Sequence, residues 1–141
     1  MKKTFAPSNK DIKRNWVFID AKDRVLGTVA AEAATKLMGK NKATFTPNMN
    51  MGDKVVIVNA SKAVVTGNKL ETKTYYWHTG YPKGLRSETL GHLLSRKPTE
   101  ALKRAIAGML PKNKLQKERM ANLYIYADEK HPHLAQKKET N

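Results

Sequence analysis

Two short runs of strand-forming residues constrain the fold of this chain more than any other feature. The first run extends from Trp16 to Ile19 and the second from Val55 to Val58, and neither alternates apolar with polar residues. A continuous apolar run of this length is typical of a parallel strand that is covered on both faces. Both segments therefore predict strands of a largely parallel sheet, with the second strand at its middle.

Segments whose apolar residues recur at the spacing of an α-helix lie between the predicted strands. Between the two runs, apolar residues recur every three to four positions from Leu26 to Met38, and Gly39 provides a C-terminal stop. Further along the chain, Ser87 is a suitable N-cap for a short helix and Pro98 is suited to the first turn of a second helix.

Two more segments predict strands, Thr74 to Trp77 and Leu123 to Tyr126. The alternation of strands with helices predicts an α/β fold, namely a three-layer α/β/α sandwich with a mostly parallel four-stranded sheet. At 141 residues the chain fits one domain. We expect a basic N-terminal arm over residues 1–15, a single α/β domain over 16–127 and a polar C-terminal tail over 128–141.

The formal net charge of +15 identifies the expected partner class. A compact body with this charge repels itself unless a polyanion neutralises it, and nucleic acid is the foremost candidate. An acidic membrane surface would require a long helix with one basic and one apolar face, which the sequence does not suggest. The absence of cysteine is compatible with a reducing compartment, and no apolar run predicts a membrane span or a secretory signal, so we expect a cytoplasmic location.

Cations and aromatic residues surround a glycine-containing loop that follows the third predicted strand. Glycine lets backbone amides approach phosphates, and an exposed aromatic ring can stack on an unpaired base. The candidate RNA-binding residues here are Lys69, Lys73, His78, Tyr81, Lys83 and Arg86. The competing interpretation, that Tyr75 to Trp77 belong to the strand core, applies to at least one face of that strand. Folded RNA fits better than duplex DNA because no known major-groove motif is present.

A second cationic segment follows Pro111 and connects a helix to the last predicted strand. It contributes four further candidates, Lys112, Lys114, Lys117 and Arg119, offset only by Glu118. The alternative interpretation is an ordinary solvated turn. We expect a rigid scaffold to present this connector as a cationic loop.

Motifs for catalysis and cofactor binding are incomplete in this sequence. Gly39-Lys40 resembles the end of a phosphate-binding P-loop, but Asn41 replaces the magnesium-binding hydroxyl and Ala34 replaces the first glycine. No dinucleotide fingerprint follows the first strand. His131 and His133 have no cysteine and no nearby acidic cluster to complete a metal site, His78 lacks a relay partner, and the aspartates stand singly where turns explain them. We therefore expect no enzyme activity, cofactor or metal.

Short motifs are spread along nearly the whole chain. They are Trp16 with Asp20-Ala21, Leu26-Gly27 with Ala30, Gly39-Lys40-x-Lys42, Pro47, Gly52-Asp53, Asn59-Ala60, Thr66-Gly67-Asn68-Lys69, Tyr75-Tyr76, His78-Thr79-Gly80-Tyr81-Pro82 and Gly108-Met109-Leu110-Pro111. In their order and spacing these motifs together resemble the pattern of the ribosomal protein L13 family of the large subunit, in its bacterial or organellar form.

The resemblance implies a three-layer α/β domain that binds large-subunit ribosomal RNA, acts early in subunit assembly, lies beside other ribosomal proteins and has no enzymatic activity. By position it adds Lys40 and Lys42 to the RNA-facing residues, together with the segment from His78 to Arg86 and the connector. Three positions depart from the usual pattern: Thr28 replaces an arginine, and Lys83 and Gln116 each replace a glycine. These departures put individual contacts and the turn of the loop in question.

Two other function classes stay open at this point. A small nucleotide-binding enzyme would act at the carboxyl ends of the strands and would show a saturable nucleotide site. A protein-binding adaptor would keep its main partner after nuclease treatment. We expect the architectural role, in which basic loops neutralise phosphates around a rigid body.

Overall fold

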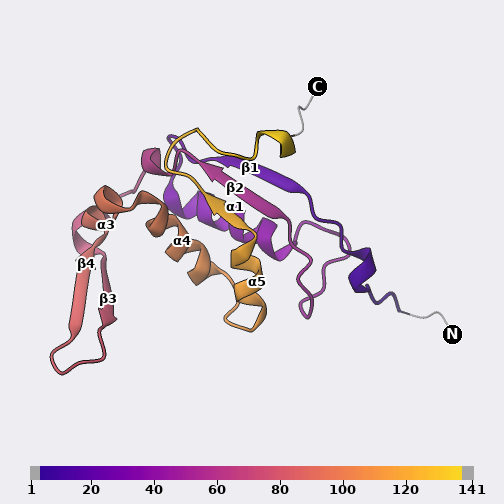
Figure 1. Ribbon diagram of the computed structural model, residues 1–141, viewed down its shortest axis with the longest axis horizontal. Coiled ribbons are helices and arrows are strands. Elements are labelled where there is room, and N and C mark those ends of the chain that lie inside the picture. Colours follow the sequence, from indigo (N-terminus) through magenta and orange to yellow (C-terminus); the bar gives the residue numbers. More distant parts are fainter. Residues whose placement is uncertain (1–3, 138–141) are drawn as a thin grey trace.

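A computed structural model describes residues 4–137 and shows a mixed α/β fold with a projecting hairpin (Figure 1). Its helices and strands follow in the order β1 (Trp16–Asp20), α1 (Leu26–Met38), β2 (Lys54–Val58), α2 (Lys69–Thr72), β3 (Thr74–His78), β4 (Leu85–Thr89), α3 (Leu90–Arg96), α4 (Pro98–Met109), α5 (Leu115–Ala121) and β5 (Leu123–Ile125).

The main sheet has three parallel strands in the order β1-β2-β5. Ile57 on β2 is the partner of Ile19 on β1 and of Ile125 on β5. The prediction that the second apolar run forms the middle of a parallel sheet is therefore confirmed. The prediction of four strands in that sheet is wrong, because β3 pairs elsewhere.

Strand β3 forms an antiparallel hairpin with β4, with Tyr76 opposite Ser87 and Trp77 opposite Arg86. A central parallel strand must bury both faces, whereas Tyr76, Trp77 and His78 are all exposed. The partner strand also follows after only six residues, and closing a short loop costs less conformational entropy than reaching the distant sheet. The sequence pattern does not predict β4, because Leu85 and Arg86 directly follow the glycine-containing loop.

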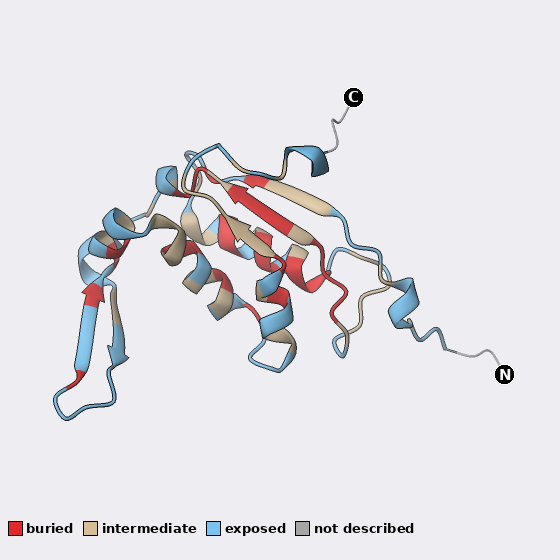
Figure 2. Cartoon of the chain, in the orientation of Figure 1, coloured by how far each residue is buried: buried red, intermediate tan, exposed pale blue. Residues whose placement is uncertain are grey.

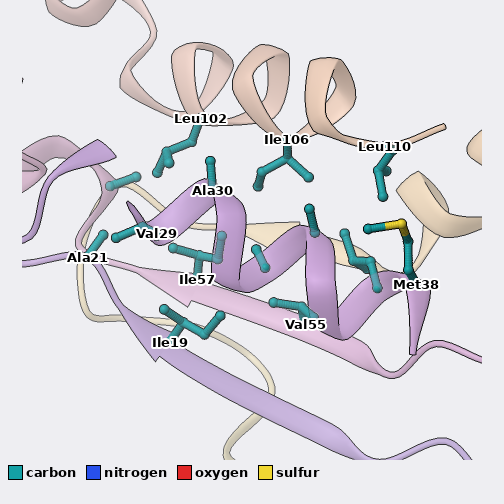
Figure 3. Packing of buried hydrophobic residues seen from close by; sticks show 14 residues of the cluster. Ile19, Ala21, Val29, Ala30, Met38, Val55, Ile57, Leu102, Ile106 and Leu110 are labelled. Atoms are coloured by element: carbon teal, nitrogen blue, oxygen red, sulfur yellow. The ribbon is translucent and has the colours of Figure 1, made fainter. Parts of the chain in front are cut away.

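One face of the main sheet packs against helices. Ile19, Val55 and Ile57 point toward α1, and α4 packs on the far side of α1 through Leu102 and Ile106 (Figure 3). Ala30, Ala33 and Ala34 of α1 belong to the same buried cluster as these two α4 residues. Helix α5 joins the same side through Met120.

The opposite face of the sheet is covered by aromatic rings and not by an α-helix, so far as residues 4–137 are described. Trp16 and Tyr124 stack across the central strand with ring centroids 5.6 Å apart, and Val56 beneath them is fully buried. His133 packs on both rings, at 5.0 Å from Trp16 and 4.7 Å from Tyr124. The predicted three-layer α/β/α arrangement is therefore not what these residues form: α1 and α4 are stacked on one side.

The turn between α1 and β2 depends on close backbone packing. Helix α1 ends at Gly39, which adopts a left-handed conformation with φ 78° as the sequence predicts. Gly52 then passes so near the end of the helix that a Cβ atom placed on it would lie 1.6 Å from the carbonyl oxygen of Leu37. Only glycine fits at this position, and the next residue donates its N–H to the carbonyl of Lys36.

The burial pattern separates a packed body from an exposed hairpin. Most of the buried hydrophobic residues lie on β2, α1 and the facing side of α4, whereas β3 and β4 are largely exposed (Figure 2). Among the described residues, no helix is long and apolar enough to cross a membrane. The division into arm, domain and tail stays a prediction, and the ends of the expected arm and tail, residues 1–3 and 138–141, lie outside the described residues.

Candidate nucleic-acid interface

The β3-β4 hairpin extends away from the packed body and carries the loop of residues 79–84 at its tip (Figure 1). Tyr81 is 75% exposed and Trp77 is 44% exposed. His78, Lys83 and Arg86 are also exposed. The hairpin therefore presents aromatic rings beside three groups that can donate hydrogen bonds to phosphates, as binding to single-stranded or looped RNA requires.

The tip loop is held in one conformation by its own hydrogen bonds. Thr79 donates its N–H to the carbonyl of Gly84 at 3.0 Å, and Gly84 donates to the carbonyl of Tyr81 at 2.9 Å. Gly80 donates its N–H to Nδ1 of His78 at 2.9 Å. Lys83 adopts φ 56°, a left-handed conformation that favours glycine, so this lysine keeps the turn at some conformational cost.

The base of the hairpin is fixed to α3 by a buried carboxylate. Glu88 accepts hydrogen bonds from Nε and Nη2 of Arg96, at 3.1 and 2.8 Å, and its Oε1 lies 2.6 Å from Nδ1 of His92. These bonds, the one to Arg96 above all, lower the pKa of Glu88 from 4.5 to about 2. The hairpin is therefore anchored to the body by a pair of charge-assisted hydrogen bonds.

Replacing Glu88 with glutamine should remove a stabilisation that depends on pH. Because the carboxyl pKa is lower in the folded state, the unfolded state binds more protons, and the contribution is present above about pH 4.5 and lost as the pH falls toward 2. The difference in urea midpoint between the wild type and Glu88→Gln should therefore be largest near pH 7 and should shrink near pH 3. Glu71→Gln, at an exposed site, should show no such difference. A constant difference at both pH values would contradict the anchor.

A second group of cations lies near the start of β3. Lys69 and Lys73 are exposed; Lys69 is the first residue of the single turn of α2, and Lys73 follows its last residue. The Nζ atom of Lys73 lies 5.6 Å from the centre of the Tyr75 ring, while Arg104 of α4 covers the same ring with its Cζ at 4.9 Å. Arg104 is not predictable as part of this group, because nothing in the helical pattern of the sequence shows that this residue faces the hairpin.

The connector after Pro111 differs in part from the predicted loop. Lys112, Lys114 and Lys117 are exposed, and Figure 1 shows their segment extending on the same side of the view as the hairpin tip. However, the second half of the connector forms α5. Gln116 donates from Nε2 to the carbonyl of Ala107 at 2.8 Å and so fastens α5 to the end of α4.

Nearly the whole chain is similar in sequence to proteins of one known family. The sequence profile of the family described as "Ribosomal protein L13" matches residues 14–132. The chain belongs to the ribosomal protein L13 family. It is similar to the proteins named "Large ribosomal subunit protein uL13" of Dehalococcoides mccartyi, with 51% identity over 98% of this chain and 96% of the relative, and of Maridesulfovibrio salexigens, with 49% identity over 95% and 94%. The resemblance stated from the sequence is confirmed.

Two residues predicted for the RNA surface of this L13 family member are turned inward in the structure. Arg119 is only 2% exposed, and burial lowers the pKa of its guanidinium, partly offset by Glu118. Lys42 directs its Nζ inward, 2.6 Å from Oδ1 of Asp53 and 2.9 Å from the carbonyl of Met51. We therefore exclude both from the candidate interface. Lys40, two positions before Lys42, is exposed and remains in it.

The isolated polar residues that could suggest a catalytic site make contacts within the fold. Asp20, at the carboxyl end of β1, accepts hydrogen bonds from the N–H of Lys22 at 2.9 Å and from Nδ2 of Asn59 at 2.8 Å, and these bonds lower its pKa. His131 packs on Phe18 at 5.5 Å and Nε2 of His133 lies 2.9 Å from the Tyr126 hydroxyl. Within residues 4–137, no group of three or more His, Cys, Asp or Glu side chains could hold a metal ion.

Trp77 is the functional candidate that sequence reasoning missed on the hairpin. The interpretation of Tyr75 to Trp77 as strand core holds only for Tyr75, which packs beside Leu90 and Leu93. Tyr76 is 68% exposed, so both faces of the distal hairpin carry an accessible aromatic ring. The signal that could have found these residues is the second strand: once β4 is recognised, β3 belongs to a two-stranded hairpin that has two open faces.

Proposed function

We propose that this chain is a structural constituent of the large ribosomal subunit that binds large-subunit ribosomal RNA through its basic loops, supports early subunit assembly and performs no chemistry. The observation that carries the proposal is the exposure of cations and aromatic rings on a rigid hairpin that projects from the packed body. Relatives named as large-subunit proteins match at least 95% of this chain. It follows that the protein would work in the ribosome, in contact with ribosomal RNA and neighbouring ribosomal proteins in the cytoplasm.

The mechanism is electrostatic and architectural. Exposed cations on three segments, namely the loop after α1, the hairpin with its base, and the connector, neutralise phosphates of RNA segments that would otherwise repel one another. The aromatic rings of the hairpin stack on unpaired bases. Because the Glu88 anchor and the hydrogen bonds within the tip fix these groups before binding, little conformational entropy is lost when RNA docks.

Charge reversal in the connector tests this proposal. The triple variant Lys112→Glu, Lys114→Glu, Lys117→Glu should stay folded, because the three side chains are exposed, but should bind large-subunit ribosomal RNA more weakly. Losing three phosphate contacts should reduce the slope of log affinity against log salt by about three. Filter binding over a salt series measures the slope, and circular dichroism confirms the fold.

A matched control variant for the connector carries the same change in net charge at three lysines elsewhere on the surface. Lys22, Lys62 and Lys130 are exposed and lie outside the candidate interface. Their triple reversal to glutamate should leave the salt slope nearly unchanged. Equal losses in the two triple variants would show that net charge, and not the connector, determines binding, and unfolding of the connector variant would show that the connector is structural.

A further inference from the structure

A cleft of about 420 Å³ lies where the hairpin unit joins the packed body. Its walls come from the start of α1, the segment before α2, the first residues of β3 and the second half of α4. A volume in this range is typical of sites that hold a small molecule or a single residue of a larger partner. The cleft is separate from the hairpin tip and from the connector.

The floor of this cleft is apolar although it is open to solvent. Val25, Val64 and Met109 line it and are 38%, 42% and 43% exposed. Val25 and Val64 are joined by a backbone bridge, with the N–H of Leu26 donating to the carbonyl of Val64 at 2.9 Å, so this part of the floor is held in place. Three partly exposed aliphatic side chains therefore surround one hollow and are available to the apolar face of a ligand.

The rim of the cleft is cationic. Lys69, Lys73 and Arg104 line it, and none of the described lining residues is acidic. Arg104 is held over Tyr75 and is also bonded through Nε to Oε1 of Glu100 at 3.2 Å, so its position is fixed. An occupant must therefore combine an apolar face with negative charge.

We propose that this cleft receives one unstacked nucleotide of the bound RNA, with the base on the apolar floor and the flanking phosphates at the cationic rim. A base offers a broad face without hydrogen-bonding groups, and its phosphates supply the complementary charge. Lys73 directly precedes β3, so an RNA strand that follows the hairpin passes the mouth of the cleft. The inference rests on the proposed function and adds a specific site to it.

Gly108 provides the means to test this site. It lines the cleft, it is exposed, and a Cβ atom placed on it would meet no other heavy atom within 4 Å. The chain contains no cysteine, so Gly108→Cys can be labelled at a single position with benzophenone maleimide. Irradiation of the labelled protein on large-subunit ribosomal RNA transcribed in vitro should give one dominant crosslink, mapped by primer extension to a nucleotide that is unpaired in the RNA.

A second label separates the cleft from the hairpin. Thr79→Cys, labelled in the same way in the exposed tip loop, reports on RNA binding itself and keeps the Tyr81 ring. A crosslink from position 79 with none from position 108 would overturn the cleft inference and leave the proposed function standing. No crosslink from either position would overturn both. In assembled subunits, a crosslink from position 108 to a protein in place of RNA would also overturn the cleft inference.

A variant that fills the cleft tests independently whether the cleft contributes to RNA affinity. Gly108→Phe should weaken RNA binding about tenfold, the loss expected when one base can no longer stack on the protein. Thr35→Phe, which places the same ring at an exposed site on α1 outside the cleft, should not. Thermal unfolding identifies a folding defect in either variant. Equal RNA affinity of Gly108→Phe and the wild type, with both proteins folded, would contradict the proposal.

Discussion

Raising the monovalent salt concentration from about 50 to about 200 mM should weaken binding to large-subunit ribosomal RNA by about a thousandfold. Each phosphate that a lysine or arginine neutralises releases a condensed cation into solution, and salt opposes that release. Contacts to about six phosphates account for a loss of this size. The exposed cations of the candidate interface are sufficient for six contacts: Lys40, Lys69, Lys73, Lys83, Arg86, Lys112, Lys114 and Lys117.

The salt response also separates the architectural role from the alternatives. Affinity should be measured by filter binding at several salt concentrations with one RNA and at constant pH. A slope shallower than about two would mean that few phosphates are contacted and would count against binding through several loops. A nucleotide-binding enzyme would instead saturate with a free nucleotide, and an adaptor would keep its partner after nuclease treatment.

The packed body could be predicted because its elements have strong local patterns. Strands β1 and β2 are continuous apolar runs, helix α1 has helical periodicity and a glycine stop, and α4 begins at Pro98, so the structure confirms these elements. The parallel pairing of β1 with β2 also follows from sequence, since a helix separates the two strands. Here the local signals and the tertiary packing agree.

The hairpin and α5 could not be predicted in the same way, because contacts with neighbouring helices hold them and their own residue patterns do not show these contacts. Strand β4 is mostly exposed, and its end is held by the hydrogen bonds that Arg96 of α3 donates to Glu88. In α5, the sequence shows Arg119 as one more cation, but the helix turns this side chain into the interior. Lysines and arginines have long apolar stems, so charge alone does not show whether they face solvent.

Replacing Lys42 with methionine should destabilise the fold, whereas the same change at Lys40 should not. Nζ of Lys42 contacts Oδ1 of Asp53 at 2.6 Å and donates to the carbonyl of Lys13 at 2.6 Å, which ties the N-terminal segment to the loop after α1. The Asp53 side chain is only 3% exposed. Without Lys42, the one remaining donor to this carboxylate within residues 4–137 is the N–H of Asn15 at 3.0 Å, and leaving a buried charge unpaired costs about 3 to 5 kcal/mol.

Comparison of the two lysines separates folding from RNA binding. In urea denaturation, Lys42→Met should lose about 3 kcal/mol or more of unfolding free energy, and adding Asp53→Asn should restore much of it because the unpaired charge is gone. Lys40 is exposed, so Lys40→Met should change stability by less than about 0.5 kcal/mol. It should still reduce the salt slope of RNA binding by about one. If instead Lys42→Met were as stable as the wild type and bound RNA more weakly, Lys42 would belong to the RNA surface after all.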